Sequence, residues 1–391
     1  MKRNILITVL CTCCLSPVPA QGVDDVLRSV AQHNKSIQAA LKNGEAERTS
    51  IEAENLPEDP SVEYSSFYGK GVNGQAGSEL VVSQGFDFPT VYRIRNRAGR
   101  ERKEAVNYRI EALRRDILLE AKNLCLDLIR LNRQHDLLTR RMQNADELLT
   151  FYEERLKAGD ATIIEVNKIK MERMSIQTEV LQNNAEHRTA LQTLLALNGN
   201  MPLTFEEREY PVVPSTADFE TLQDEALASD AGLLAAEADT RAASRNLAAS
   251  RQNWLPRLEI GYRRNTNEGG KEHGFLIGGS IPLFSNRRQV KIAQAQAIGS
   301  RLQADGERLQ TEAGLQAGFN EMKQLEQALS VYDLSLMART LDLLKESVKG
   351  GQMSVTDYFV EADQIYRNQQ ACMELECRYQ KVAATLWKNR L

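Results

Sequence analysis

The sequence has few aromatic residues, prolines and cysteines for its length of 391 residues. Aromatic residues make up 6% and prolines number ten, whereas hydrophobic residues make up 42% and charged residues 26%. Alanine, leucine, glutamate, glutamine and arginine dominate, which is the composition of long helices. The net charge is only −4 and both signs are interspersed. A nucleic-acid partner, which would require a basic face, is therefore not predicted.

Cysteine and histidine are too few and too scattered to predict a disulfide framework or a metal site. Beyond the first twenty residues the cysteines are Cys125, Cys372 and Cys377, an odd number. We expect them to be small apolar packing residues in helix interfaces. The four histidines lie far apart, and the sequence has no phosphate-binding loop and no nucleophile elbow. Neither an enzyme nor a cofactor-binding protein is predicted.

Residues 1–20 have the pattern of a signal peptide. Lys2 and Arg3 precede an apolar stretch, and Val18-Pro19-Ala20 is a small-residue cleavage site. Lipidation of Cys13 or Cys14 is the alternative, although the residues before them match a lipoprotein motif poorly. No apolar run of 18 residues follows, so no transmembrane helix is predicted. The exported chain is either soluble outside the cytoplasm or enters a membrane as β-strands.

Residues 90–157 are predicted to form one long helix. No proline or glycine interrupts the stretch after Gly99, and apolar or small residues recur mostly at alternating spacings of three and four from Leu113 to Leu156. At ~1.5 Å per residue, a helix of this length runs roughly 100 Å, far longer than a globular core can use. It therefore needs neighbours along its whole length.

The chain is a tandem duplication of helix, β-hairpin, long helix and helix. Pro256 lies 196 positions after Pro60, and Gly351 lies 192 positions after Gly159. The first repeat spans 21–200, with hairpin strands at about 60–89 and the long helix at about 90–157. A proline-marked connector follows at 201–216. The second repeat spans 217–391, with hairpin strands at about 256–284 and a long helix at about 287–349.

Alternation with a period of two predicts the four strands. The alternating sets are Val62, Tyr64, Ser66 and Tyr68; Leu80, Val82, Gln84, Phe86 and Phe88; Leu258, Ile260 and Tyr262; and Phe275, Ile277, Gly279, Ile281 and Leu283. Strands of about 9–12 residues suit a tilted membrane crossing. Open sheet edges cannot face lipid, so several chains would have to close one barrel. A soluble sheet that caps the helices is the alternative.

Together these features resemble the TolC family of outer-membrane efflux proteins. The resemblance covers the chain after residue 20. It rests on the hairpin ends Ser83–Pro89 and Gly279–Phe284 and on the glycine turns Arg155–Thr162 and Val348–Ser354. It implies a mainly α fold with a transmembrane β-barrel. Three copies would form a homotrimer whose twelve strands make one outer-membrane barrel, continued by a periplasmic α-helical barrel.

The implied function is that of a passive, gated exit duct in a tripartite efflux system. The implied partners are a periplasmic membrane-fusion adaptor, an inner-membrane RND or ABC pump reached through it, and outer-membrane lipid. A type I protein-secretion duct of the same fold and a soluble periplasmic coiled-coil scaffold are the alternatives. The resemblance does not distinguish metal ions, drugs, bile salts and proteins as cargo.

The glycine turns would lie at the periplasmic tip, where the family docks its adaptor. The residues that could contact the adaptor are Lys157, Gly159, Asp160, Lys349, Gly351 and Gln352. Their other role is to end a helix, which basic residues and a following glycine do.

Acidic residues just past the tip glycine can form a constriction ring in this family. Glu165 lies six positions after Gly159, and Asp357 lies six positions after Gly351. In a trimer they would bring six carboxylates together and attract cations. The alternative is that both are solvated helix residues. A second acidic layer is in doubt, because Lys168 and Val360 occupy its positions.

Overall fold

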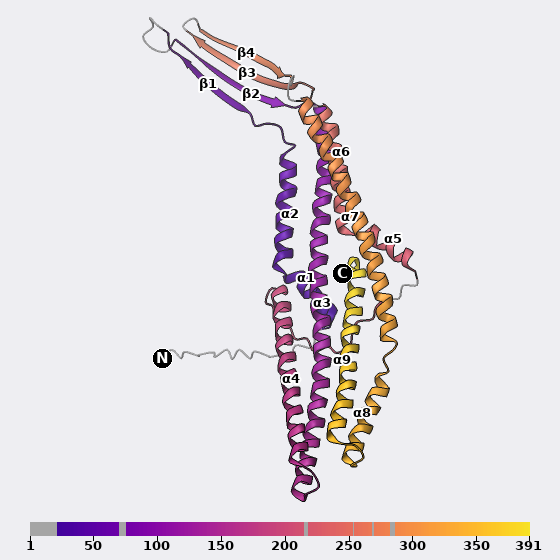
Figure 1. Cartoon of the computed structure of the whole chain (residues 1–391). Helices are drawn as coiled ribbons and strands as arrows, with labels where there is room; N and C mark the ends of the chain where they lie inside the picture. The colour runs from indigo at the N-terminus through magenta and orange to yellow at the C-terminus, as the bar shows by residue number, and fades with distance from the viewer. Residues whose placement is uncertain (1–21, 70–75, 215–217, 253, 268–269, 282–285) are drawn as a thin grey trace, which may run out of the picture. The chain divides into compact units, whose positions relative to one another are not determined.

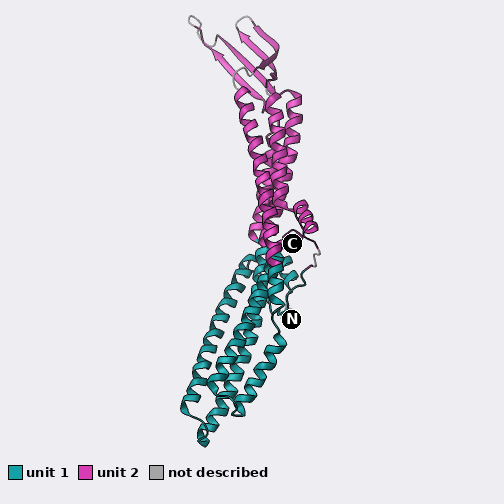
Figure 2. Ribbon diagram, turned by 45° about the vertical axis from the view of Figure 1, so that its right-hand side comes forward, with its two compact units in different colours: residues 1–34, 118–213, 323–384 teal, residues 35–117, 214–322, 385–391 magenta. Residues whose placement is uncertain are grey.

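The computed structural model describes residues 22–69, 76–214, 218–252, 254–267, 270–281 and 286–391 (Figure 1). The predicted signal peptide, most of the first hairpin loop, part of the connector and Pro282–Phe284 lie outside the described residues. The chain forms two compact units, each built from parts of both repeats (Figure 2). Unit 1 contains residues 22–34, Leu118–Val213 and Lys323–Ala384, and unit 2 contains Lys35–Ile117, Pro214–Met322 and Thr385–Leu391.

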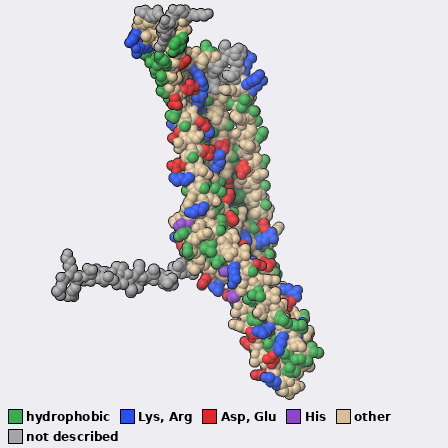
Figure 3. All heavy atoms as spheres, turned by 90° about the vertical axis from the view of Figure 1, so that its left-hand side faces the viewer, with side chains coloured by type: hydrophobic (Ala, Val, Ile, Leu, Met, Phe, Trp, Pro, Cys, Tyr) green, Lys and Arg blue, Asp and Glu red, His purple; other side chains and the backbone are tan. Residues whose placement is uncertain are grey.

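Helices make up most of the described chain, which confirms the predicted mainly α fold. They are α1 (Val23–His33), α2 (Lys35–Ala53), α3 (Pro89–Ala158), α4 (Ile163–Leu197), α5 (Phe219–Ser229), α6 (Ala231–Gln252), α7 (Asn286–Leu329), α8 (Leu334–Lys349) and α9 (Val355–Leu386), followed by the short 3-10 helix η1 (Lys388–Arg390). Among the described residues, no helix combines the length and the apolarity of a membrane span. Figure 3 shows acidic and basic side chains interspersed over the helices.

Helix α3 is continuous over 70 residues, as the sequence predicted. In unit 1 its predicted seam is buried against α4, where Leu138 and Ala145 pack on Ile176. On another side of α3, Leu126 packs on Cys377 of α9. The helix therefore has apolar neighbours on more than one side, which explains why so long a helix is stable in this chain.

The predicted long helix at 287–349 is wrong, because the structure breaks it into α7 and α8. After the end of α7 the backbone forms 3-10 turns, in which Val331 N donates to Ala328 O and Tyr332 N donates to Leu329 O. Asp333 then caps α8 by accepting a hydrogen bond from a backbone amide of its first turn. Asp333 lies 192 positions after Arg141 of the unbroken α3. The two repeats therefore differ in helix continuity at equivalent positions.

The first helix of each repeat is also broken, at Asn34 and at Asp230. These two residues are 196 positions apart, the same offset as between Pro60 and Pro256. The amide Nδ2 of Asn34 donates to Leu197 O at 2.8 Å. The break thus brings the end of α1 to the end of α4 within unit 1.

The sheet consists of β1 (Ser61–Phe67), β2 (Gly77–Phe86), β3 (Arg257–Asn267) and β4 (Gly270–Ser280). Its order is β1-β2-β3-β4 and every pair is antiparallel. The two predicted hairpins are confirmed, and they join through the pairing of β2 with β3. Within the described residues, β1 and β4 each pair on one side only.

The register separates the side chains of the sheet into two unlike faces, because directly paired residues point to the same side. One face is mainly apolar and carries Val62, Tyr64, Leu80, Val82, Phe86, Leu258, Ile260, Tyr262, Phe275 and Ile277. The other face, here called the polar face, carries Glu63, Glu79, Glu259, Glu272, Arg257 and Arg263. On the apolar face, Phe275 is 91% exposed and Ile277 is 85% exposed. Exposure of this extent indicates a surface that another apolar medium or partner covers.

Ion pairs fix the sheet to the helices of unit 2. Asp87, just after β2, pairs with Arg95 of α3 at 2.6 Å and with Arg257 of β3 at 3.0 Å. Arg257 also pairs with Glu58, just before β1, at 2.9 Å. These contacts tie both ends of the first hairpin and the start of the second hairpin to one point.

Candidate functional site

The turn between α3 and α4 closes with two backbone hydrogen bonds around Gly159. Gly159 N donates to Leu156 O at 3.2 Å, and Asp160 N donates to Arg155 O at 2.8 Å. This pair is the Schellman motif, which requires a left-handed residue. Gly159 has a φ of 84°, so glycine is the residue that adopts this backbone without strain.

The turn between α8 and α9 repeats this arrangement 192 positions later. Gly351 N donates to Val348 O at 3.3 Å, and Gln352 N donates to Ser347 O at 2.9 Å. The φ of Gly351 is 73°. The duplication therefore extends to individual hydrogen bonds, and the helix-ending role of both glycines is confirmed.

Glu165 belongs to a capping box at the start of α4. The backbone N and the Oγ1 of Thr162 donate to its Oε2 at 2.7 and 2.8 Å, and Glu165 N donates to Thr162 Oγ1 at 3.3 Å. These hydrogen bonds hold the pKa of the Glu165 carboxyl below its usual range. The sequence pattern Thr-x-x-Glu after the glycine turn is the signal for this cap.

Asp357 occupies the equivalent place at the start of α9. Ser354 Oγ donates to Asp357 Oδ2 at 2.7 Å, and Asp357 N donates to Ser354 Oγ at 3.1 Å. Asp357 is exposed and Glu165 is partly exposed. Each predicted ring carboxylate is thus oriented by its own helix start, and its part in a constriction ring stays a prediction.

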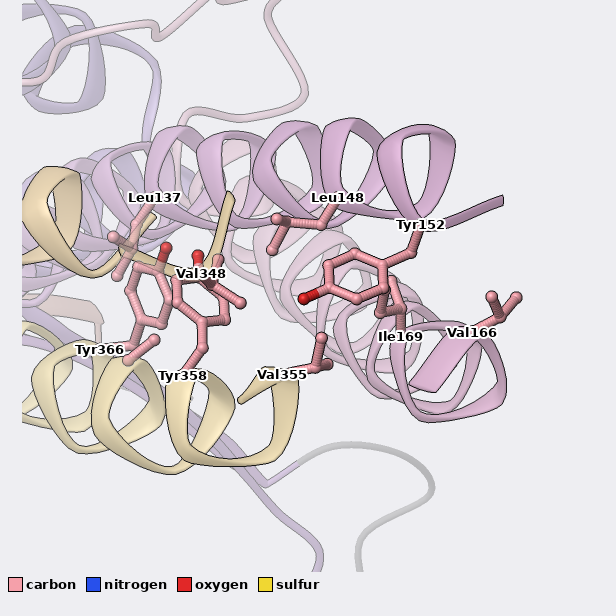
Figure 4. Close-up of a cluster of buried hydrophobic side chains, with 10 residues drawn as sticks. Leu137, Leu148, Tyr152, Val166, Ile169, Val348, Val355, Tyr358 and Tyr366 are labelled. Atoms are coloured by element: carbon pink, nitrogen blue, oxygen red, sulfur yellow. The ribbon is translucent and has the colours of Figure 1, made fainter. Parts of the chain in front are cut away.

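A single apolar core in unit 1 lies beneath both turns (Figure 4). Leu148 and Tyr152 of α3 and Ile169 of α4 meet Tyr358 and Tyr366 of α9 in this core. Burial raises the pKa values of the Tyr358 and Tyr366 phenols, so both stay neutral. The two repeats are therefore not independent at their turns, because they share the same buried side chains.

Polar contacts beside this core join α3 to α8 and α9. Glu147 of α3 pairs with Lys345 at 2.7 Å and with Lys349 at 3.4 Å. The side-chain amide of Asn144 donates to the Tyr366 hydroxyl at 3.2 Å. Lys349, a predicted adaptor contact, is thus already engaged within the chain. Its counterpart Lys157 makes no ion pair with any described residue.

Arg141 of α3 is the most buried charged side chain of this region, with 4% exposure. Its guanidinium contacts Glu179 at 2.9 Å and Glu172 at 3.2 Å, both on α4, and Asp363 of α9 at 4.0 Å. It also lies 4.7 Å from the centre of the Tyr366 ring. One cation therefore contacts carboxylates from two neighbouring helices and joins α3 to α4 and α9.

The two turns differ in the apolar surface that they expose. Ile163 and Ile164 are 56% and 76% exposed at the start of α4. Val355, the equivalent of Ile163, is buried in the shared core with 1% exposure. This difference carries no signal in the sequence, because Ile163 and Val355 are both apolar residues that follow a cap residue.

The cysteines among the described residues, Cys125, Cys372 and Cys377, are buried and free, as expected for packing residues. Burial raises the pKa of the Cys125 thiol to about 12 and raises those of Cys372 and Cys377. The thiols are therefore protonated and unreactive at neutral pH.

Replacing Glu165 with alanine is expected to lower stability near neutral pH and to have less effect in acid. The lowered pKa means that Glu165 stabilises the fold above the pKa of an unfolded glutamate, and that this contribution is lost as the pH falls through the folded value. Unfolding midpoints of wild type and variant at pH 7 and at about pH 3 measure the difference. Glu154→Ala is the control, because Glu154 is exposed and makes no ion pair with described residues. An equal effect of Glu165→Ala at both pH values would contradict the capping account.

The family model "Outer membrane efflux protein" matches residues 222–388. The solved structure of CusC is 15% identical, with a TM-score of 0.78, and the alignment covers 94% of this chain and 92% of CusC. The outer membrane channel CmeC of Campylobacter jejuni is 16% identical, with a TM-score of 0.75 and coverage of 94% and 85%. The outer membrane channel MtrE of Neisseria gonorrhoeae is 15% identical, with a TM-score of 0.73 and coverage of 94% and 88%. Comparison with curated protein sequences gives no match.

The fold, with duplicated helices, glycine turns and one four-stranded sheet, is that of the outer-membrane efflux channels. At these identities the solved structures establish the fold, and the family match covers most of the second repeat. The predicted resemblance to the TolC family is confirmed: residues 222–388 match the family model, and the chain has the fold of these outer-membrane channels.

Proposed function

We propose that three copies of this chain form the passive exit duct of a tripartite efflux system. The observation that carries this proposal is the sheet of unit 2, which has one apolar face, one polar face and two strands with an unpaired edge. An apolar face of this kind suits lipid, whereas unpaired backbone groups at an edge do not. Strands of a second and a third copy would pair with β1 and β4 and satisfy the backbone hydrogen-bonding groups at these edges.

The polar face then lines the interior of the closed twelve-stranded sheet. Four strand glutamates lie on this face, and one of them, Glu79, pairs with Arg263 at 2.8 Å. Charged side chains in such an interior are in water, so they carry only a small desolvation cost. In the proposed system, transport through this passive duct is driven by the pump that delivers the cargo.

The two glycine turns are the proposed docking site for a periplasmic adaptor. Lys157, Asp160 and Gln352 are exposed beside the turns. The exposed Ile163 and Ile164 add an apolar patch at the first turn only. A partner helix hairpin with apolar residues beside acidic ones would complement Lys157 and this patch. An inner-membrane RND or ABC pump joins the system through the adaptor.

Planar bilayers containing the purified protein test the duct and the carboxylate ring together. Wild type is expected to open pores that prefer cations. Glu165→Gln combined with Asp357→Asn should weaken this preference and the block by multivalent cations severalfold, because six carboxylates are neutralised in the trimer.

The matched control is Glu154→Gln combined with Glu346→Gln. These exposed glutamates are also 192 positions apart and precede the same two turns. They should leave the selectivity unchanged. Absence of any conductance would refute the duct, and equal effects of both double variants would refute the ring at Glu165 and Asp357.

A further inference from the structure

The apolar face of the sheet carries three basic residues and no carboxylate within the described strands. The basic residues are Arg264 of β3 and Lys271 and His273 of β4. All four glutamates of the described strands lie on the polar face. The carboxylates are thus confined to the polar face, whereas basic side chains lie on both faces.

The three residues lie near the turn between β3 and β4. Figure 1 shows this turn at the end of the sheet away from the helices. Arg264 and His273 are directly paired. Lys271 pairs with Thr266, two residues closer to the turn on each strand. The His273 ring stacks on Tyr262 with 6.0 Å between ring centres, and its Nδ1 shares a hydrogen bond with the Tyr262 hydroxyl. Tyr262 therefore holds His273 beside Arg264.

The distance of these three residues from Ile281, measured across the membrane, places them near one boundary of the apolar band of an outer membrane. From Ile281 to His273 the chain advances eight residues, which at ~3.3 Å per residue and a strand tilt of ~40° is roughly 20 Å. An outer-membrane apolar band is about 25 Å tall. With Ile281 near the periplasmic boundary, Arg264, Lys271 and His273 lie at the outer boundary.

Arg264 differs from its neighbour Arg263, which faces the other side. Arg263 forms an ion pair with Glu79 at 2.8 Å. The Nε of Arg264 is buried and has no hydrogen-bond partner among the described residues. Lys271 is exposed and also makes no ion pair with them. Cations at an apolar boundary without a protein anion require an external one.

We propose that Arg264, Lys271 and His273 bind the phosphate groups of an outer-leaflet lipid. Phosphate oxygens accept charge-assisted hydrogen bonds from guanidinium and ammonium groups. The acyl chains of the same lipid would lie along Phe275 and Ile277, which are the most exposed apolar side chains of the described strands. Charge and apolar surface together therefore fit an amphipathic anion rather than a free one. This inference rests on the outer-membrane placement of the proposed duct.

Native mass spectrometry of the purified trimer tests the inference. The probes are diphosphoryl lipid A and the same glycolipid without its phosphates. Wild type should retain the phosphorylated lipid preferentially, and Arg264→Gln with Lys271→Gln should reduce this preference by about fivefold for each cation removed. Arg263→Gln, one residue away on the polar face, is the matched control and should keep the preference.

Equal retention of both glycolipids by wild type would overturn the inference. So would a loss of preference in Arg263→Gln as large as in Arg264→Gln, or complete displacement of the lipid by inorganic phosphate. A protein that conducts in bilayers without a preference for the phosphorylated lipid would refute this site alone. A protein that does not conduct would refute the duct itself.

Discussion

Replacing Arg141 with leucine is expected to lower the free energy of unfolding by about 3 kcal/mol. The substitution removes the only cation in contact with both Glu172 and Glu179 among the described residues, and it leaves these carboxylates beside an apolar side chain. It also removes the guanidinium from the face of the Tyr366 ring. Because the carboxylates are partly exposed, the cost should lie at the lower end of the range for broken buried ion pairs. Thermal unfolding followed by circular dichroism measures the loss.

Arg140→Ala is the control for Arg141, since the neighbouring arginine is exposed and makes no ion pair with described residues. It should change the unfolding midpoint little. Arg141→Lys should recover part of the stability, because an ammonium keeps the charge but cannot contact Glu172 and Glu179 in the guanidinium geometry. An Arg141→Leu protein as stable as wild type would show that these three helices are held by apolar packing alone.

Replacing both Gly159 and Gly351 with valine is expected to abolish efflux while the trimer still assembles. Both residues have a positive φ, and a Cβ at either position would meet no atom within 4 Å. The substitution therefore distorts the turns through backbone strain of about 1 kcal/mol or more per site, without a clash in the core. A deletion strain that carries the variant, tested against copper, zinc, detergents and several antibiotics, measures the loss.

Gly350→Ala is the matched control because Gly350 lies beside Gly351 but has an ordinary φ of −75°. It should keep resistance at the wild-type level. Trimer assembly of every variant is checked by native gel electrophoresis. Normal resistance of the valine variant would refute the proposed docking role of the turns. Loss of the trimer would show that the turns are needed for assembly instead.

Sequence periodicity predicted the sheet and α3 because each has a dominant physical cause. Alternation at Val62, Tyr64, Ile260 and Tyr262 requires strands, and the register then places these residues on one face. The 70-residue α3 contains no proline after its first residue and keeps its apolar seam. Elements of this kind depend on local sequence, so one chain is sufficient to find them.

The break between α7 and α8 could not be predicted from periodicity. An aspartate such as Asp333 can occupy either an exposed position inside a helix or a helix cap, so the sequence alone does not reveal the break. In the structure Asp333 is a cap, because its Oδ1 accepts a hydrogen bond from Leu336 N. The capping roles of Thr162 and Ser354 could have been predicted from the Thr-x-x-Glu and Ser-x-x-Asp patterns. The contacts of Arg141 could not, because its partners lie on helices 31 and more positions away.

The shared core beneath the two turns has a consequence for symmetry. A threefold assembly of a duplicated chain presents six turns, which are equivalent in their hydrogen bonds but not in their surfaces. Three of them expose a pair of isoleucines where the other three have a buried valine and an exposed threonine. A partner present in six copies would thus bind in two unlike modes, alternating around the ring, whereas a partner present in three copies has one preferred set of sites. In the proposed trimer, the burial of Val355 is therefore one feature that distinguishes the two sets of turns.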